Sequence, residues 1–231
     1  AIKSGFDAIS DKVSMVGQTK EVVNKDLYLK QFFGGLPLTL YFDNDQPKEN
    51  PGASASACPL DYEQSYQGYL GKKGIFIAEY VTGLRGTDAE IARSEAARFF
   101  DSEIQSGFYD LLKLSENLLF ALQNGEQIEL HIEGYASPLA DEHHNQQLAE
   151  RRIQTILNHF ENYKEGALKK YLGKELTIKR IPYGEKSASG EVSDNASDRR
   201  SSVYSPKASR ERRVIIGGFR VPANSASTSL K

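Results

Sequence analysis

The stretch from Ile128 to Phe160 changes from a two-residue apolar period to a helical one, and this change most constrains the fold. Ile128, Leu130 and Ile132 alternate with polar residues, as in a strand with one face in the core. Residues 134–140 predict a tight turn. The next apolar residues recur at helical spacing: Ala149, Ile153, Ile156, Leu157 and Phe160. The sequence therefore predicts strand, turn and helix, with Asp141 as the helix N-cap and the end near Tyr163.

The same two periods predict the other main elements. Leu36–Phe42 alternates like a first strand, and apolar residues at steps of three and four predict a helix over 104–122 that ends at Asn124-Gly125. A third strand is expected over 176–181 and a last one over 213–216. This order predicts an α/β fold of the α+β kind. We expect a two-layer sandwich, with a mixed four-stranded sheet and helices on one face.

The domain organisation follows from changes in composition. Residues 1–35 are predicted to be a leader or linker, with a helix over 21–33, and residues 36–219 a single domain. Insertions are expected at about 43–97 and 184–209, and a flexible tail over 220–231. The first insertion contains a helical excursion whose tyrosines anchor it to the domain or stack on sugars. The second is expected to be a long surface loop. A basic stretch in and after it is interpreted as solvated, and the alternative is contact with anionic glycan peptides or a partner protein; its residues are Arg199, Arg200, Lys207, Arg210, Arg212 and Arg213.

Several functional classes are excluded by composition or motif. A net charge of −2 and a pI near 6.2 give no basic field for nucleic acid. No stretch approaches the roughly 20 apolar residues of a membrane span, so no membrane insertion is expected. Cys58 is the only cysteine and cannot form an internal disulfide. We find no phosphate loop, nucleophile elbow or paired catalytic carboxylates, so the prediction is a non-catalytic domain without a cofactor.

The paired arginines of the second helix are expected to differ in their environment. On a helical wheel Arg151 lies opposite the apolar face and is predicted to be solvated, whereas Arg152 lies on its flank and is partly covered. A covered arginine needs an acceptor, usually a carboxylate. One alternative is an internal partner, such as Glu133, Asp141, Glu142 or Asp45. The other is a ligand carboxylate at the mouth of the sheet.

The adjacent His143 and His144 diverge on the helix, so no metal site is expected.

Several separated motifs carry a family resemblance. They are Tyr41-Phe42-Asp43-Asn44-Asp45, the turn Gly134-Tyr135-Ala136-Ser137, Asn145, Leu148-Ala149-Glu150-Arg151-Arg152, and Glu211-Arg212-Arg213-Val214. In this order they resemble the OmpA C-terminal-like domains, which bind peptidoglycan. The resemblance covers residues 36–46 and about 98–217. It implies a periplasmic domain, associated with the outer membrane or cell wall, that tethers an envelope protein by binding stem peptides.

The resemblance also implies ligand-binding residues. In the family the second arginine of the helix motif contacts the carboxylate of diaminopimelate, and an aspartate fifteen residues earlier contacts its ammonium. Arg152 occupies the arginine position, but Ser137 occupies that of the aspartate. Serine can form a hydrogen bond and cannot neutralise an ammonium. Asp45, Asp141 or Glu142 is hypothesised to supply the charge. The implied ligand residues are Asp45, Ala136, Ser137, Asn145 and Arg152.

Two other functions stay open at this point. One is a protein interaction module that kept the fold and lost the ligand, with the two insertions as its contact surface. An enzyme acting on the cell wall is a more distant alternative. For each of these functions, the ends of the first two strands are expected to meet at one edge of the sheet, because both are carboxyl ends of parallel strands.

Overall fold

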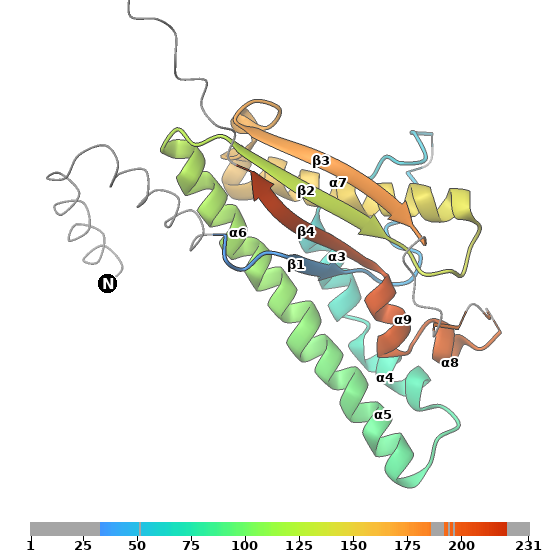
Figure 1. The fold of residues 1–231 in the computed structure, drawn as a ribbon. Helices are drawn as coiled ribbons and strands as arrows, with labels where there is room; N and C mark the ends of the chain where they lie inside the picture. The colour runs from blue at the N-terminus through green and yellow to red at the C-terminus, as the bar shows by residue number, and fades with distance from the viewer. Residues whose placement is uncertain (1–32, 51, 186–191, 194, 196, 221–231) are drawn as a thin grey trace, which may run out of the picture. The chain divides into compact units, whose positions relative to one another are not determined.

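The computed structural model describes residues 33–50, 52–185, 192–193, 195 and 197–220 (Figure 1). The chain divides into two compact units, residues 1–35 and 36–231, and the description below concerns the second. The helix expected over 21–33 lies, except for its last residue, outside the described residues. The tail beyond residue 220 also lies outside them.

A mixed four-stranded sheet forms the first layer, as predicted. Its strands are β1 (Leu38–Tyr41), β2 (Ile128–Tyr135), β3 (Leu176–Gly184) and β4 (Arg213–Arg220), in the spatial order β1-β4-β2-β3. β2 and β3 are parallel, and β4 runs antiparallel to both β1 and β2. β1 and β2 therefore point the same way, and their carboxyl ends lie at one edge of the sheet, as expected from the sequence (Figure 1).

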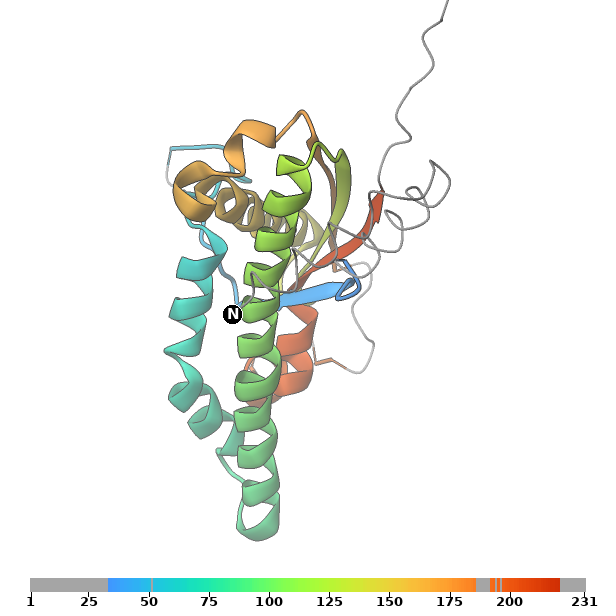
Figure 2. The same ribbon diagram turned by 90° about the vertical axis from the view of Figure 1, so that its left-hand side faces the viewer.

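Two long helices cover one face of the sheet and form the second layer (Figure 2). They are α6 (Gln105–Gln123) and α7 (Glu142–Gly166). The alternating residues Leu38, Leu40, Ile128, Leu130 and Ile132 face them and are buried. α7 begins as predicted, because the Asp141 carboxylate accepts a hydrogen bond from the backbone N–H of His144 at 2.9 Å. The predicted two-layer sandwich is confirmed.

The first insertion is helical from residue 62 onwards. It contains α3 (Tyr62–Leu70), α4 (Lys73–Val81) and α5 (Gly86–Arg98). A π-helical turn, η1 (Phe99–Ile104), joins α5 directly to α6, so this helix starts well before the predicted residue 104. Tyr62, Tyr66 and Tyr69 are buried, and Tyr66 stacks on Phe108 with ring centroids 4.2 Å apart. These tyrosines anchor the insertion to the domain.

The second insertion was predicted to be a loop, but its described part contains two short helices. They are α8 (Arg199–Ser202) and α9 (Pro206–Glu211), and a 3-10 turn, η2 (Lys169–Tyr171), precedes β3. Capping explains why polar sequence is helical here: the Asp198 side chain accepts from Ser201 N–H and the Ser205 side chain from Ala208 N–H. The interpretation of the basic stretch as solvated is wrong for Arg212, which is fully buried.

Candidate ligand site

A cavity of about 400 Å³ lies at the edge of the sheet where β1 and β2 end. Its walls come from three separate parts of the chain: residues 44–45 after β1, residues 137–148 around the start of α7, and residues 199–203 in and after α8. Its polar lining residues are Asn44, Asp45, Ser137, His144, Asn145 and Arg199. Leu139, Leu148 and Val203 supply apolar surface. The mixture of charged, amide and apolar groups is typical of small-molecule sites.

Three of the five predicted site residues meet in this cavity. Asp45, Ser137 and Asn145 line it, although Asp45 lies far from the other two in the sequence. Ala136 does not line the cavity: it is buried, and its N–H donates to the Gly184 carbonyl oxygen at 2.8 Å. Arg152 is also outside the lining.

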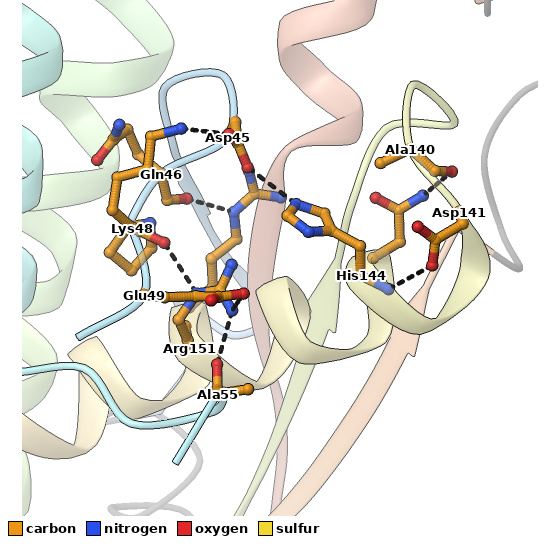
Figure 3. Close-up of polar contacts among 12 residues, drawn as sticks. Asp45, Gln46, Lys48, Glu49, Ala55, Ala140, Asp141, His144 and Arg151 are labelled. Atoms are coloured by element: carbon orange, nitrogen blue, oxygen red, sulfur yellow. Dashed lines mark hydrogen bonds and ion pairs between the residues drawn. The ribbon is translucent and has the colours of Figure 1, made fainter. Parts of the chain in front are cut away.

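Asp45 is the acidic group of the cavity. Its backbone φ is +49°, which is uncommon outside glycine and best tolerated by Asp and Asn. Its carboxylate pairs with Lys48 and lies 2.9 Å from Nε2 of His144 (Figure 3). Partial burial works to raise the pKa of Asp45, but the hydrogen bonds and charges of Lys48 and His144 outweigh it and lower the pKa below its usual value. Asp45 is therefore ionised near neutral pH.

The opposite wall is held by Asn145 in the first turn of α7. Its side-chain Nδ2 donates to the Ala140 carbonyl oxygen at 2.9 Å and to Oε2 of Glu185 at 2.6 Å. These bonds join the turn after β2 to the end of β3. Ser137, which is 7% exposed, lies in the same turn and accepts at its carbonyl oxygen from the N–H of Leu139 at 2.9 Å. The wall is thus built before any ligand arrives.

The close approach of β2 and α7 fixes where that turn lies. A Cβ atom on Gly134 would be 2.6 Å from the Ala149 carbonyl oxygen, so only glycine fits this position. The turn leaves β2 directly after this contact. The Gly of the family-like motif therefore has a packing reason of its own in this chain.

The hydrogen-bond acceptors of Arg152 are backbone carbonyl oxygens and not the carboxylate expected from the sequence. It is fully buried, and its nitrogens donate to the carbonyl oxygens of Gln46 (Nε, 3.0 Å), Tyr135 (Nη1, 2.6 Å) and Asp43 (Nη2, 3.4 Å). Its guanidinium also lies 5.4 Å from the ring centre of Phe42. Burial, followed by the charge of Arg212, lowers the pKa of Arg152 to about 9. Both alternatives had assumed a carboxylate partner, whereas these acceptors belong to the backbone.

The prediction that Arg151 is solvated is wrong, because this side chain is only 1% exposed. The connection between β1 and α3 crosses this side of α7. Arg151 donates to the carbonyl oxygens of Pro47 (Nε, 2.9 Å) and Ala55 (Nη1, 2.6 Å) and lies 3.5 Å from Glu49 (Figure 3). The helical wheel predicts exposure from the apolar residues of α7 alone. It does not show that another segment of the chain covers the polar side of this helix.

Together the two arginines hold residues 43–60, which we call the 43–60 segment, against α7. Asn158 adds two bonds, because its Nδ2 donates to the carbonyl oxygens of Cys58 and Leu60, each at 2.8 Å. The segment has no regular secondary structure among its described residues, and its carbonyls need these partners. Asp45 lies in this segment, so side chains of α7 position the acidic group of the cavity.

Arg212 positions the third wall in the same manner. It donates to the Val203 carbonyl oxygen at 2.9 Å and to Oγ of Ser209 at 2.7 Å. It thereby ties the start of β4 to α8 and α9. From the sequence, Arg212 is expected only as part of a solvated basic stretch, so this structural role was not predicted.

The structure adds His144 and Arg199 to the predicted site residues. His144 lay in the sequence beside the expected N-cap and was considered only as a metal ligand. Arg199 belongs to the basic stretch for which contact with anionic glycan peptides was the less favoured alternative, but that stretch has no periodicity to show which residue returns to the sheet edge. Within the described ranges, no group of three or more His, Cys, Asp or Glu side chains is placed to hold a metal ion. In the same ranges, no helix combines the length and apolar character needed to cross a membrane.

The fold and the cavity define a two-layer α/β domain with a polar cavity at the carboxyl edge of its sheet. Comparison of the chain with protein-family models, with curated proteins and with solved structures finds no match in any of the three. The residues of the cavity are therefore the basis for assigning a function to this chain.

Proposed function

We propose that this chain is a non-catalytic peptidoglycan-binding domain, which recognises the diaminopimelate of stem peptides in the cavity. It would act in the periplasm and tether an envelope protein to the cell wall. One observation supports the proposal above all others: Asp45, Ser137 and Asn145, predicted as ligand residues from separate motifs, line one cavity. A ligand site is also expected at this edge of an open α/β sheet.

In this proposal Asp45 takes the role that Ser137 cannot fill. Its ionised carboxylate receives the ammonium of diaminopimelate, which replaces the ammonium of Lys48. The Lys48 side chain is 66% exposed, so water can solvate it after the exchange. Ser137 and Asn145 then contact the polar groups of the stem peptide. Arg151 and Arg152 act by holding the 43–60 segment in place.

The first experiment is sedimentation of the purified chain with insoluble sacculi. We expect the protein in the pellet, and release by excess soluble diaminopimelate-containing muropeptide. Protein that stays wholly in the supernatant would contradict the tether and favour the interaction module. The exposed Ile75 and Ile91, on α4 and α5, would then be the first residues to test as a contact surface.

The second experiment locates the site by calorimetric titration of that muropeptide. Asp45→Asn removes the charge and keeps a residue that tolerates positive φ, so the backbone is preserved. We expect it to weaken binding at least roughly tenfold, the loss of one charge-assisted contact. Asp110→Asn is the matched control, because Asp110 is exposed on α6 and pairs only locally with Lys113. Equal affinities in all three proteins would exclude the cavity as the site.

A further inference from the structure

We propose that Arg199, rather than Arg152, binds the carboxylate of the ligand. This inference rests on the proposed function and deepens it, since it assigns a second charged residue to the same cavity. It also places the residue in the second insertion, outside every motif that carried the family resemblance.

Arg152 is a poor carboxylate receptor in this chain. It is fully buried, does not line the cavity, and directs three of its nitrogens to backbone carbonyl oxygens. A ligand carboxylate would have to displace bonds that hold the 43–60 segment. Leaving those buried carbonyls without donors carries the full cost of their desolvation. Arg152 is therefore better described as a positioning residue.

Arg199 has the opposite properties. It lines the cavity from α8 and is exposed. Tyr204 orients it: Nη2 of Arg199 donates to the Tyr204 hydroxyl at 2.8 Å, and the guanidinium carbon lies 5.3 Å from the centre of that ring. No carboxylate of the described residues pairs with it. A guanidinium carries five N–H donors in a rigid plane, so the donors beyond the Tyr204 bond suit a carboxylate.

The charges around the cavity then match a zwitterion. Asp45, on the wall after β1, receives the ammonium in exchange for Lys48, and Arg199, on the wall formed by α8, receives the carboxylate. Asn145 and Ser137 lie in the remaining wall and offer neutral hydrogen-bonding groups. A ligand group with both charges, such as the free end of diaminopimelate, satisfies both walls at once, whereas a lysine side chain satisfies only Asp45.

The test pairs a change in the protein with a change in the ligand. Two muropeptides are titrated calorimetrically: one with free diaminopimelate, and the same one with the side-chain carboxylate amidated. We expect wild type to prefer the free acid at least roughly tenfold, as for a lost charged partner. Arg199→Gln should bind both weakly and equally. Arg199→Lys keeps the charge without the planar fork and should show an intermediate preference.

Arg200→Gln is the matched control, since Arg200 is the neighbouring residue of α8 and does not line the cavity. It should behave like wild type. If Arg199→Gln keeps the full wild-type preference, the assignment of Arg199 is overturned while muropeptide binding stands. If wild type binds neither muropeptide, the proposed function and this inference both fall.

Discussion

Buried arginines with carbonyl acceptors are the main residue-scale feature of this domain. Arg151, Arg152 and Arg212 are each at most 1% exposed, and backbone carbonyl oxygens accept most of their hydrogen bonds. A guanidinium is the side chain best suited to this task, because it carries many donors and remains charged when its pKa falls. These residues replace a regular ladder of backbone hydrogen bonds in the connections around the cavity.

Replacing Arg152 with Met should therefore be costly. The substitution keeps apolar volume but leaves the carbonyls of Gln46 and Tyr135 without their donor. We expect the free energy of unfolding in urea to fall by about 3 kcal/mol or more, since each buried orphaned acceptor costs about 1–3 kcal/mol. Arg180→Met is the control, because the pair of Arg180 with Glu150 is partly exposed and should be worth at most about 1 kcal/mol. Similar losses in both variants would contradict this role for Arg152.

His159 predicts a pH dependence of stability. It lies between α6 and α7, 5% exposed, with Nε2 3.1 Å from Oγ of Ser115. Because that hydroxyl donates to the Leu111 carbonyl oxygen, Nε2–H of the neutral imidazole is assigned as the donor to Ser115. Burial lowers the pKa of His159 from 6.5 to about 4. The charged form is thus disfavoured in the folded protein.

Between pH 6.5 and 4 the unfolded chain binds more protons at this residue than the folded protein does. The contribution of His159 to the free energy of unfolding is therefore complete above pH 6.5 and is lost as the pH falls towards 4. The total loss over this pKa shift is on the order of 3 kcal/mol. In urea unfolding across this range, His159→Gln should show a shallower loss of stability than wild type. His143→Gln, at an exposed position, should keep the wild-type slope. An unchanged slope in His159→Gln would be inconsistent with the assignment.

At the scale of elements, apolar periodicity was enough to predict the strands and the two covering helices. Each of these elements has one face in the core, so its apolar residues recur at a fixed period in the sequence. Short elements contain too few residues to show such a period. α8 and α9 depend on caps, and η1 continues α5 into α6 through Phe99 and Phe100 without a local break. The sequence therefore predicted one helix where the structure has a continuous helical stretch from α5 to α6.

The contact between α6 and β1 can be tested at Gly107. A Cβ atom there would be 2.7 Å from the Thr39 carbonyl oxygen, which is backbone and cannot move alone. Gly107→Ala should therefore lower the free energy of unfolding by about 1–3 kcal/mol, as overpacking does, despite the better helix propensity of alanine. Gly68→Ala, in α3 with open space around it, should raise stability by up to about 1 kcal/mol. A stabilised Gly107→Ala variant would show that the two elements are further apart.

The attachment of the 43–60 segment to α7 can be followed with the single cysteine. Cys58 is 7% exposed, so a thiol reagent reaches it only when the segment opens. Asn158→Asp replaces a donor to the Cys58 and Leu60 carbonyls with an acceptor. Loss of these bonds should increase the rate of Cys58 modification at least roughly tenfold. Gln147→Glu adds the same charge on α7, where the side chain contacts the exposed His143, and should change the rate little. Equal rates in the two variants would argue against this attachment.

For the whole molecule, the position of the candidate cavity was more predictable than the set of residues that line it. The direction of β1 and β2 brought Asp45 and Ser137 to one edge, because parallel strands end together. The place of Arg199 in the cavity could not be predicted, since a basic stretch without a period does not show which residue lies at the sheet edge. The burial of Arg151 was missed for a related reason: whether a helix face is covered depends on a segment about a hundred residues away in the sequence.

Ligand binding should be visible in the stability of the whole domain. A ligand that binds only the folded state, at 100 times its dissociation constant, adds about 2.7 kcal/mol to the free energy of unfolding. For a chain of this size that corresponds to a rise in Tm of about 5–10 °C. Diaminopimelate-containing muropeptide should produce this shift in thermal unfolding of wild type, and a smaller one in Asp45→Asn at the same concentration. A wild-type Tm that does not respond at any concentration would contradict binding to the folded state.

The place of β4 in the sheet also makes closure of this sheet a late event in folding. β4 lies between β1 and β2, and Leu38 pairs with Ile216, so this contact joins residues far apart in the sequence. β2, α7 and β3 follow one another in the sequence and can assemble first. Until β4 docks, β1 has no neighbouring strand and β2 keeps an open edge. A chain cut before residue 213 would therefore expose both strands and tend to aggregate.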